Sequence, residues 1–380
     1  MFESLRTTAF RNLADAETDV SGKNVFLVGE NGQGKTNFLE SLYFCSYASS
    51  FRGTKDADLA RTGDEDFSVC GGFSGGIILV KVEKSHKTIA LDGKKIDDRK
   101  DLLETAPCVV FCHEDMEFVS GSQERRRWFF DQTQSLYDPV YLDDLRRYRR
   151  VLKSRNAVLR NCRLGFVGRD ETFGLLNALD GQLVGYGLSL MEKRHKAAES
   201  FSAVFSALYG EVSGIEGLGV AYTPSWKHTG ALAELAEATE AAREKVLCRL
   251  EERREADIAQ GYTLSGPHRD RYVFIRQSAG SGDFSETAST GQRRLLALLL
   301  RVAQARCFHT MTGKTPVLLL DDVILELDGE KRRRFLSVMP DYEQAFFTFL
   351  PEEPYKKYQD SDTMIYTVHG GVIRPGEKNR

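Results

Sequence analysis

The spacing of apolar positions along the chain predicts which segments are strands and which are helices. Asn24 to Val28 is a short apolar run, as expected of a buried strand. Beyond Lys35, the positions Leu39, Leu42, Tyr43 and Ser46 follow the i, i+3, i+4, i+7 spacing of one helix face, which predicts a helix with a largely buried face. The same reasoning predicts an apolar helix at 295–308 and two more buried strands, at 317–321 and 344–349.

Between these segments the pattern changes twice. Residues 67–92 show short apolar runs broken by glycine pairs, which predicts antiparallel hairpins. From 123 to 256 the strand signal nearly vanishes, and glycine-marked breaks near Gly165, Gly210 and Gly230 separate stretches of helical periodicity. Strand patterning returns at 262–264 and 272–275. We therefore expect an α/β protein with a large helical insertion, too interrupted for a long coiled coil.

Composition narrows the class of protein. The chain has 380 residues, of which 41% are hydrophobic and 28% charged, and its formal net charge is −3. It contains no apolar stretch long enough for a membrane span, and the start, Met1 to Arg6, is not a secretory signal. The seven cysteines are scattered without zinc-like spacing. We expect a cytoplasmic protein of two or three domains, with no membrane partner, whose nucleic-acid contacts, if any, come from local basic patches.

One phosphate-binding motif follows the first predicted buried strand. The segment Gly29-Glu30-Asn31-Gly32-Gln33-Gly34-Lys35-Thr36 fits G-x-x-x-x-G-K-[ST] without a mismatch. Its backbone N–H groups would surround a phosphate at a helix N-terminus, and Lys35 would reach the β- and γ-phosphates. The Thr36 hydroxyl would bind Mg²⁺. The motif predicts ATP and Mg²⁺ as ligands.

Two further pieces of a nucleotide site lie near the other end of the chain. Asp321 ends a buried strand, where a carboxylate that directs Mg²⁺ is expected, and Asp322 beside it is placed to polarise an attacking water. Upstream, Ser289, Gly291 and Gln292 open the apolar helix and would form a second anion cradle. Two cradles in one chain cannot hold the same γ-phosphate, whereas two copies of the chain related by a two-fold axis can. We therefore predict a dimer that closes on ATP, with Lys35, Asp321 and Asp322 as catalytic residues.

Arginine-rich segments are the candidates for DNA contact. The densest are 125–127, 146–155 and 331–334, although each is also typical of a solvated helix face. The candidate DNA-binding residues are Arg126, Arg127, Arg146, Arg147, Arg149 and Arg150.

Taken together, these segments resemble the RecF family of bacterial recombinational-repair proteins, which are compact relatives of the SMC and ABC-type ATPases. The motifs that carry the resemblance are Phe10-Arg11-Asn12, the loop Gly29 to Asn37, Ser50-Phe51-Arg52, Glu114-Asp115, Arg126-Arg127, Asp131, Arg155-Asn156, Gly266 to Asp270, Ser289 to Arg293 and Leu319 to Asp328. The resemblance adds Asn37 to the nucleotide-binding residues.

The resemblance implies an ABC/SMC-type ATPase head, with a mixed sheet and an antiparallel β-subdomain, plus an inserted helical arm. The implied ranges are 1–122 and 257–380 for the two parts of the head and 123–256 for the arm. It also implies an ATP-dependent dimer with slow, DNA-stimulated hydrolysis that binds single-strand/double-strand junctions. RecR and RecO are the implied partners, which together help load RecA onto gapped DNA.

Three positions depart from the family pattern. His113 and Gln123 replace two prolines, and Arg271 stands where a second aspartate is usual. The strand 344–349 ends in Thr348-Phe349, without the histidine that transporter ATPases place there. Two other functions stay open on the residues alone: the soluble ATPase subunit of a transporter, and a small-molecule kinase that uses the same phosphate loop.

Overall fold

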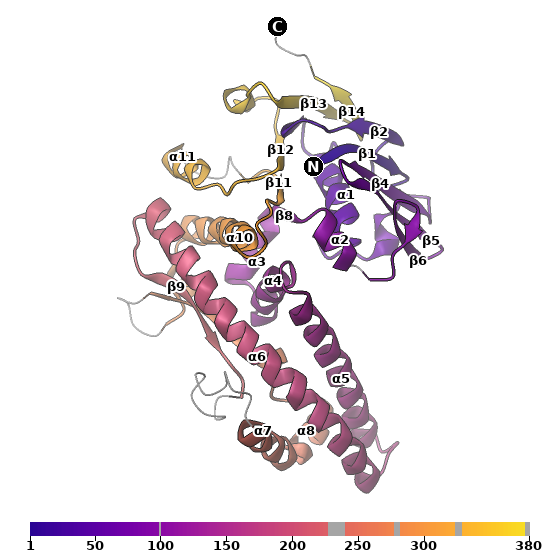
Figure 1. Ribbon diagram of the computed structural model, residues 1–380, viewed down its shortest axis with the longest axis vertical. Coiled ribbons are helices and arrows are strands. Elements are labelled where there is room, and N and C mark those ends of the chain that lie inside the picture. Colours follow the sequence, from indigo (N-terminus) through magenta and orange to yellow (C-terminus); the bar gives the residue numbers. More distant parts are fainter. Residues whose placement is uncertain (99, 227–239, 277–281, 324–328, 377–380) are drawn as a thin grey trace. The chain divides into compact units, whose positions relative to one another are not determined.

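Two compact units make up the chain in the computed structural model (Figure 1). The model describes every residue except 99, 227–239, 277–281, 324–328 and 377–380. One unit joins 1–115 with 298–380, and the other is 116–297. Residues 257–297 thus group with the inserted unit, whereas the ranges predicted from the sequence placed them with the C-terminal part of the head.

A mostly parallel sheet organises the first unit. Its strand order is β14-β13-β3-β12-β11-β8, and only the β13/β14 pair is antiparallel. The strands are β3 (Asn24–Val28), β8 (Cys108–Phe111), β11 (Val317–Leu320), β12 (Gln344–Phe349), β13 (Thr363–His369) and β14 (Val372–Pro375). The pairings Leu320↔Phe347 and Phe349↔Val28 bring the carboxyl ends of β11, β12 and β3 to one edge of the sheet. The three apolar strands predicted from the sequence are confirmed, and β8, β13 and β14 were missed.

A second, antiparallel sheet completes this unit. Its order is β2-β1-β4-β5-β6-β7, formed by β1 (Phe2–Thr8), β2 (Ala16–Asp19), β4 (Phe67–Phe73), β5 (Gly76–Glu83), β6 (His86–Leu91) and β7 (Lys94–Lys95). The hairpins predicted at 67–92 are confirmed. The helices of the unit are α1 (Lys35–Tyr47), α2 (Lys100–Thr105), the larger part of α10 (Thr290–Thr312) and α11 (Gly329–Ser337), with 3₁₀ turns at Asp56–Leu59, His113–Asp115 and Tyr355–Tyr358.

The unit 116–297 is largely helical. Its elements are α3 (Met116–Ser120), α4 (Gln123–Ser135), α5 (Pro139–Arg163), α6 (Arg169–Ser213), β9 (Leu218–Thr223), α7 (Glu240–Glu252), α8 (Arg254–Gln260), a 3₁₀ turn at Pro267–Arg269, β10 (Arg271–Arg276) and α9 (Phe284–Thr287). The α5 helix starts where the Asp138 carboxylate accepts the backbone N–H of Tyr141, with Pro139 in its first turn. Its apolar side packs along α6 around Tyr141, Leu145 and Tyr148.

A buried ion-pair cluster holds the far part of this helical pair. Arg155 on α5 has no exposed surface, and its guanidinium donates to Asp180 on α6 and to Asp257 on α8, both at 2.7 Å. Arg254 also donates to Asp180, at 3.0 Å. Charges buried this deeply are stable only when each is paired with an opposite charge. The cluster therefore links α5, α6 and α8.

The helical region differs from the sequence prediction in three ways. Gly210 lies inside the 45-residue helix α6, which continues to a left-handed cap at Gly214. A strand, β9, interrupts the predicted all-helical stretch and pairs antiparallel with β10. Residues 262–264 are not a strand, because they lead into the turn that positions Asp270. The predicted break at Gly230 and the start of the helix-rich 231–256 segment lie outside the described residues.

Candidate functional site

The glycine loop runs from the end of β3 into α1 and adopts a conformation that needs its glycines. Gly32 and Gly34 have positive φ angles of 77° and 116°, which residues with a Cβ rarely adopt. A Cβ on Gly34 would also lie 3.0 Å from the Asn12 Oδ1 atom. The loop is supported from outside, since the Gly371 N–H donates to the Gln33 carbonyl at 2.8 Å and Asn12 Nδ2 donates to the Gly32 carbonyl at 3.3 Å.

Lys35 is a buried ammonium held against this loop. Its side chain is almost fully covered, and Nζ donates to the carbonyls of Gly29 at 2.6 Å and Glu30 at 3.3 Å. Among the described residues, no carboxylate forms an ion pair with it. A buried cation that has only carbonyl partners is matched to an anionic ligand, because burial without a counter-ion is costly. The loop and the lysine therefore fit a phosphate group.

Asp321, which comes from the other end of the chain, contacts the end of this loop. The Thr36 hydroxyl donates to Asp321 Oδ1 at 2.9 Å, which places the hydroxyl and carboxylate needed for Mg²⁺ side by side. Asp322 follows with φ of 53°, a strained angle for a non-glycine residue, and is exposed. Burial, followed by the Asp322 charge, raises the pKa of Asp321 to about 6.

Thr348 is a residue of this site that the sequence did not assign a role. Its hydroxyl accepts the backbone N–H of Asp322 at 2.8 Å and lies 2.8 Å from Asp322 Oδ1 and 3.2 Å from Asp321 Oδ1. Thr348 occupies the end of β12 at which transporter ATPases carry a histidine, and here it fixes both carboxylates. The sequence did contain an indication of this role. The strands at 317–321 and 344–349 were both predicted, and because they pair in parallel their carboxyl ends are neighbours.

A polar cluster beside α1 contains residues that the sequence analysis named only because they belong to motifs shared with the RecF family. Arg11 donates to the buried Glu40 carboxylate at 3.0 Å, and Ser50 donates to the same carboxylate at 2.5 Å. The Arg52 guanidinium reaches Asn37 Oδ1 at 3.2 Å. Positive charge at Arg52 also lowers the pKa of Asp321, although less than burial raises it. Arg52 and Asn37 therefore belong to the surroundings of the phosphate loop.

The predicted second cradle is an exposed helix start in the other unit. Ser289 and Gln292 form a reciprocal cap at the start of α10: the Ser289 N–H donates to Gln292 Oε1 at 2.8 Å, and the Gln292 N–H donates to Ser289 Oγ at 3.3 Å. Ser289 and Gly291 are exposed. The residues 324–328 of the predicted acidic segment lie outside the described part of the chain.

Of the six arginines predicted to contact DNA, one is buried and the others are at least partly exposed. Arg126 is buried, and its guanidinium is bonded to Ser285 Oγ at 2.7 Å, to the Val119 carbonyl at 2.6 Å and to Asp283. Its prediction as a DNA contact is wrong, because the guanidinium has no surface to offer a phosphate. On α5 the buried stripe that faces α6 leaves four candidates outside it: Arg147, Arg149 and Arg150 are exposed, and Arg146 is partly so. Arg127, on α4, is also partly exposed.

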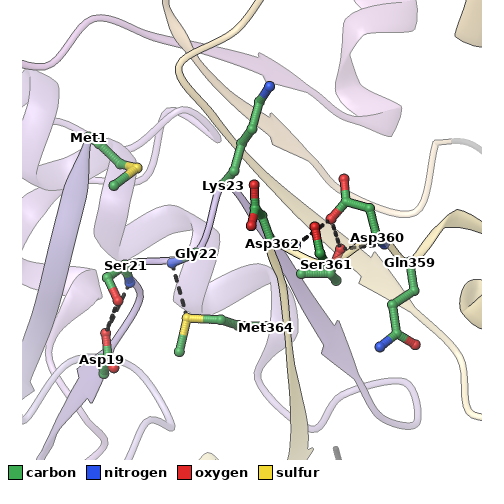
Figure 2. Close-up of a pocket in the computed structure, with 11 residues that line it drawn as sticks. Met1, Asp19, Ser21, Gly22, Lys23, Gln359, Asp360, Ser361, Asp362 and Met364 are labelled. Atoms are coloured by element: carbon green, nitrogen blue, oxygen red, sulfur yellow. Dashed lines mark hydrogen bonds between the residues drawn. The ribbon is translucent and has the colours of Figure 1, made fainter. Parts of the chain in front are cut away.

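A cleft lies at the amino ends of the parallel strands, away from the glycine loop (Figure 2). It measures about 780 Å³ and is lined by the segments 21–23 and 359–364. Two of its carboxylates accept hydrogen bonds within the protein: Asp19 accepts from Ser21, and Asp360 accepts from Thr363 and from the distant Asn24. Ligands of parallel sheets bind at the carboxyl ends of the strands, so this cleft is not the nucleotide site.

Comparison of the sequence with known proteins gives a family that matches nearly the whole chain. The family model described as RecF/RecN/SMC N terminal domain matches residues 1–374. The DNA replication and repair protein RecF of Treponema pallidum (strain Nichols) is 38% identical, over 96% of this chain and 98% of that protein. RecF of Anaeromyxobacter sp. (strain Fw109-5) is 34% identical, over 98% of each.

Solved structures lead to the same family. The recombination mediator protein RecF-ATPrS of the RecFOR pathway superimposes with a TM-score of 0.85 at 28% identity, over 99% of this chain and 98% of that one. An SmcHead bound to the C-winged helix domain of ScpA, at 14% identity and a TM-score of 0.52, shares the fold alone. The predicted ABC/SMC-type fold is thus confirmed, and the model reveals no helix in the described residues that is long and apolar enough to cross a membrane. The chain belongs to the RecF family.

Proposed function

We propose that this chain is an ATP-dependent DNA-binding protein of replication and recombinational repair. Two copies close on ATP, bind gapped DNA at single-strand/double-strand junctions and help load the recombinase, and slow DNA-stimulated hydrolysis releases them. The observation that carries the proposal is the contact between Thr36 and Asp321, which joins the phosphate loop to the carboxylates. The RecF-ATP and RecF-ATPrS names of the solved relatives support the choice of nucleotide.

The site residues have separate roles in this proposal. The backbone amides from Glu30 to Thr36, with Asn37 and the Lys35 ammonium, would hold the phosphates. Thr36 and Asp321 would hold Mg²⁺, which supplies charge neutralisation at the phosphates when bound. Asp322 would orient and polarise the attacking water, and Thr348 keeps its carboxylate in place.

Dimerisation and DNA contact use other surfaces. Ser289, Gly291 and Gln292 of each copy would complete the nucleotide site of the other, since a two-fold interface repeats each contact. Arg127, Arg146, Arg147, Arg149 and Arg150 would neutralise DNA phosphates, with a steep loss of affinity at high salt. The RecFOR pathway of the solved relatives supports RecR and RecO as partners. A cytoplasmic location stays a prediction.

Binding of a gapped duplex at matched salt tests the proposal. Wild-type protein should bind tightly with ATP, and weakly with ADP. Lys35→Met should bind with ATP no better than wild type does with ADP, whereas Lys81→Met, which removes an exposed lysine on β5, should behave as wild type. Equal binding under all nucleotide conditions would contradict an ATP-controlled DNA switch.

A further inference from the structure

A pocket of about 350 Å³ within the unit 116–297 shares no residue with the candidate nucleotide site. Four arginines from four different elements contribute to its lining: Arg127 on α4, Arg149 on α5, Arg194 on α6 and Arg269 in the 3₁₀ turn. Rings also line it, from Trp128, Tyr148 and His268. Its size falls within the range of pockets that hold small ligands.

Arg127 is a partly buried cation with few hydrogen-bond partners. Its guanidinium makes one hydrogen bond, from NH1 to the Asp270 carbonyl at 2.7 Å, and forms no ion pair with any described residue. Partial burial and the neighbouring Arg194 charge lower its pKa. A guanidinium can donate several hydrogen bonds, so Arg127 has unused donors in a partly desolvated place. Such a group attracts an anion strongly.

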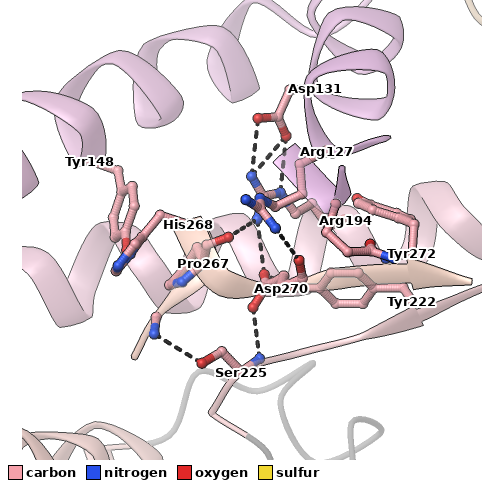
Figure 3. Close-up of polar contacts among 12 residues, drawn as sticks. Arg127, Asp131, Tyr148, Arg194, Tyr222, Ser225, Pro267, His268, Asp270 and Tyr272 are labelled. Atoms are coloured by element: carbon pink, nitrogen blue, oxygen red, sulfur yellow. Dashed lines mark hydrogen bonds and ion pairs between the residues drawn. The ribbon is translucent and has the colours of Figure 1, made fainter. Parts of the chain in front are cut away.

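The carboxylates nearby are already committed to Arg194, as Figure 3 shows. Arg194 on α6 is buried and donates to Asp131 at 2.8 Å and to Asp270 at 2.9 Å. Asp270 also accepts from the Ser225 N–H at 2.7 Å. Arg149 retains a 3.3 Å contact to Asp131, but more than half of its side chain is exposed. Of the acidic side chains that line the pocket, Glu124 alone is outside this network, so the lining carries an excess of positive charge.

Arg269 adds a second exposed cation. Its guanidinium lies 5.4 Å from the ring centroid of Tyr262, and no described carboxylate pairs with it. The turn that presents it is fixed by the hydrogen bond from the Arg269 N–H to the Gly266 carbonyl, at 2.7 Å. The lining therefore includes two guanidinium groups, those of Arg127 and Arg269, that form no ion pair with a carboxylate of the described residues.

The rings of the pocket offer flat apolar surface next to these charges. His268 lies 2.7 Å from the Tyr148 hydroxyl through Nδ1 and 3.0 Å from the Thr263 carbonyl through Nε2. Because a carbonyl only accepts, Nε2 carries a proton. Burial lowers the pKa of His268 to about 4, so the ring is neutral at pH 7 and Tyr148 donates to Nδ1. Trp128 stacks on Phe118 at 5.7 Å, which fixes the indole while leaving it partly exposed.

We propose that this pocket binds one nucleotide of a DNA single strand, with the phosphate at Arg127, Arg149 and Arg269 and the base against Trp128. Cations beside a ring are the combination that holds single strands, since the backbone is neutralised and a base stacks. An acidic peptide would satisfy the arginines but would leave the rings unused. The proposal rests on the DNA-binding function above and assigns two of its arginines, Arg127 and Arg149, to a single-strand subsite.

Intrinsic fluorescence provides a direct test, because the chain has two tryptophans and Trp226 is buried. Full-length protein with ATP and Mg²⁺ is titrated with a thymidine oligonucleotide, and in parallel with a blunt duplex, thymidine monophosphate and a glutamate peptide of equal charge. The oligonucleotide should quench Trp128 emission to saturation, and Trp128→Phe should abolish the quenching. Arg269→Ala should weaken oligonucleotide binding about tenfold and duplex binding less than about twofold.

Arg125→Ala is the matched control, since Arg125 is exposed on α4 but does not line the pocket. It should leave oligonucleotide binding unchanged. Equal losses in the two arginine variants, or equal quenching by the peptide or the mononucleotide, would overturn the single-strand assignment. Duplex binding that depends on ATP, without Trp128 quenching by the oligonucleotide, would refute the pocket and leave the proposed function standing. Failure of every DNA to bind would refute both.

Discussion

Removing the Arg194 side chain should destabilise the helical unit more than any surface change on the same helix. Arg194→Met keeps most of the length of the side chain but takes the guanidinium from two buried carboxylates, those of Asp131 and Asp270. Breaking a buried pair from one side costs about 3–5 kcal/mol of unfolding free energy, because a charge is left buried without its partner. The two losses do not add fully, since Asp270 keeps donors from Tyr222 and Ser225. We therefore expect a loss of about 3–5 kcal/mol in total.

Urea unfolding followed by tryptophan fluorescence reports on the unfolding of the unit 116–297, because Trp128 and Trp226 both lie in it. Lys196→Met on α6 is the matched control: its ammonium forms an exposed i,i+4 pair with Glu192, worth less than about 0.5 kcal/mol. Asp270→Asn in the Arg194→Met background should recover part of the stability, which a double-mutant cycle quantifies. A loss below about 1 kcal/mol for Arg194→Met would refute the assignment of this network as the centre of the unit.

The pH dependence gives an independent check on the same reasoning. Burial raises the pKa of Asp270 even beside Arg194, and removal of Arg194 takes away the main opposing cause. A carboxyl whose pKa in the folded state is raised stabilises the protein at low pH, and this contribution is lost as the pH rises through the folded pKa. The deficit of Arg194→Met should accordingly be smaller at pH 5 than at pH 8.

The nucleotide site yields three further predictions. Thr348→Val removes the hydroxyl that holds Asp322, so the hydrolysis rate constant should fall about tenfold with little change in nucleotide affinity; steady-state kinetics and nucleotide titration separate the two, and an unchanged rate would show that Thr348 has no positioning role. Asp322→Asn should slow hydrolysis at least about 100-fold and accumulate a long-lived ATP dimer in size-exclusion chromatography, whereas normal turnover would remove Asp322 from the chemistry. Ser289→Arg should spare nucleotide binding by the monomer but prevent ATP-dependent dimerisation in sedimentation, and a dimer of normal stability would contradict the shared site.

The placement of the candidate nucleotide-site residues was largely predictable, because a phosphate loop constrains local sequence. Such a loop needs glycines at fixed spacing, and buried parallel strands are continuous apolar runs, so the positions of Gly29 to Thr36 after β3 and of Asp321 after β11 could be predicted from the chain alone. The roles of these residues in nucleotide binding and hydrolysis stay predictions. Most of the missed strands are less regular: β1 and β2 alternate only partly, and β13 and β14 carry few fully buried residues. The strand β8 is fully buried but only four residues long, too short a run to be separated from its surroundings by pattern alone. Gly210 was misleading for another reason. Glycine lowers helix propensity by only about 1 kcal/mol, which the packing of a long helix easily exceeds.

Arginine function was the least predictable property, because sequence neighbours on a helix point in different directions. Arg126 and Arg127 are adjacent, yet one is buried among acceptors and the other contributes to an open pocket. Arg155 falls in the densest basic run of α5 and is fully buried, because its carboxylate partners come from α6 and α8, remote in sequence. The sequence therefore shows that a segment is positively charged, but it does not show whether its arginine side chains are exposed enough to bind a ligand. Whether a guanidinium stabilises the fold or binds a ligand depends on whether a carboxylate faces it, and that is settled by tertiary contacts such as those of Arg194.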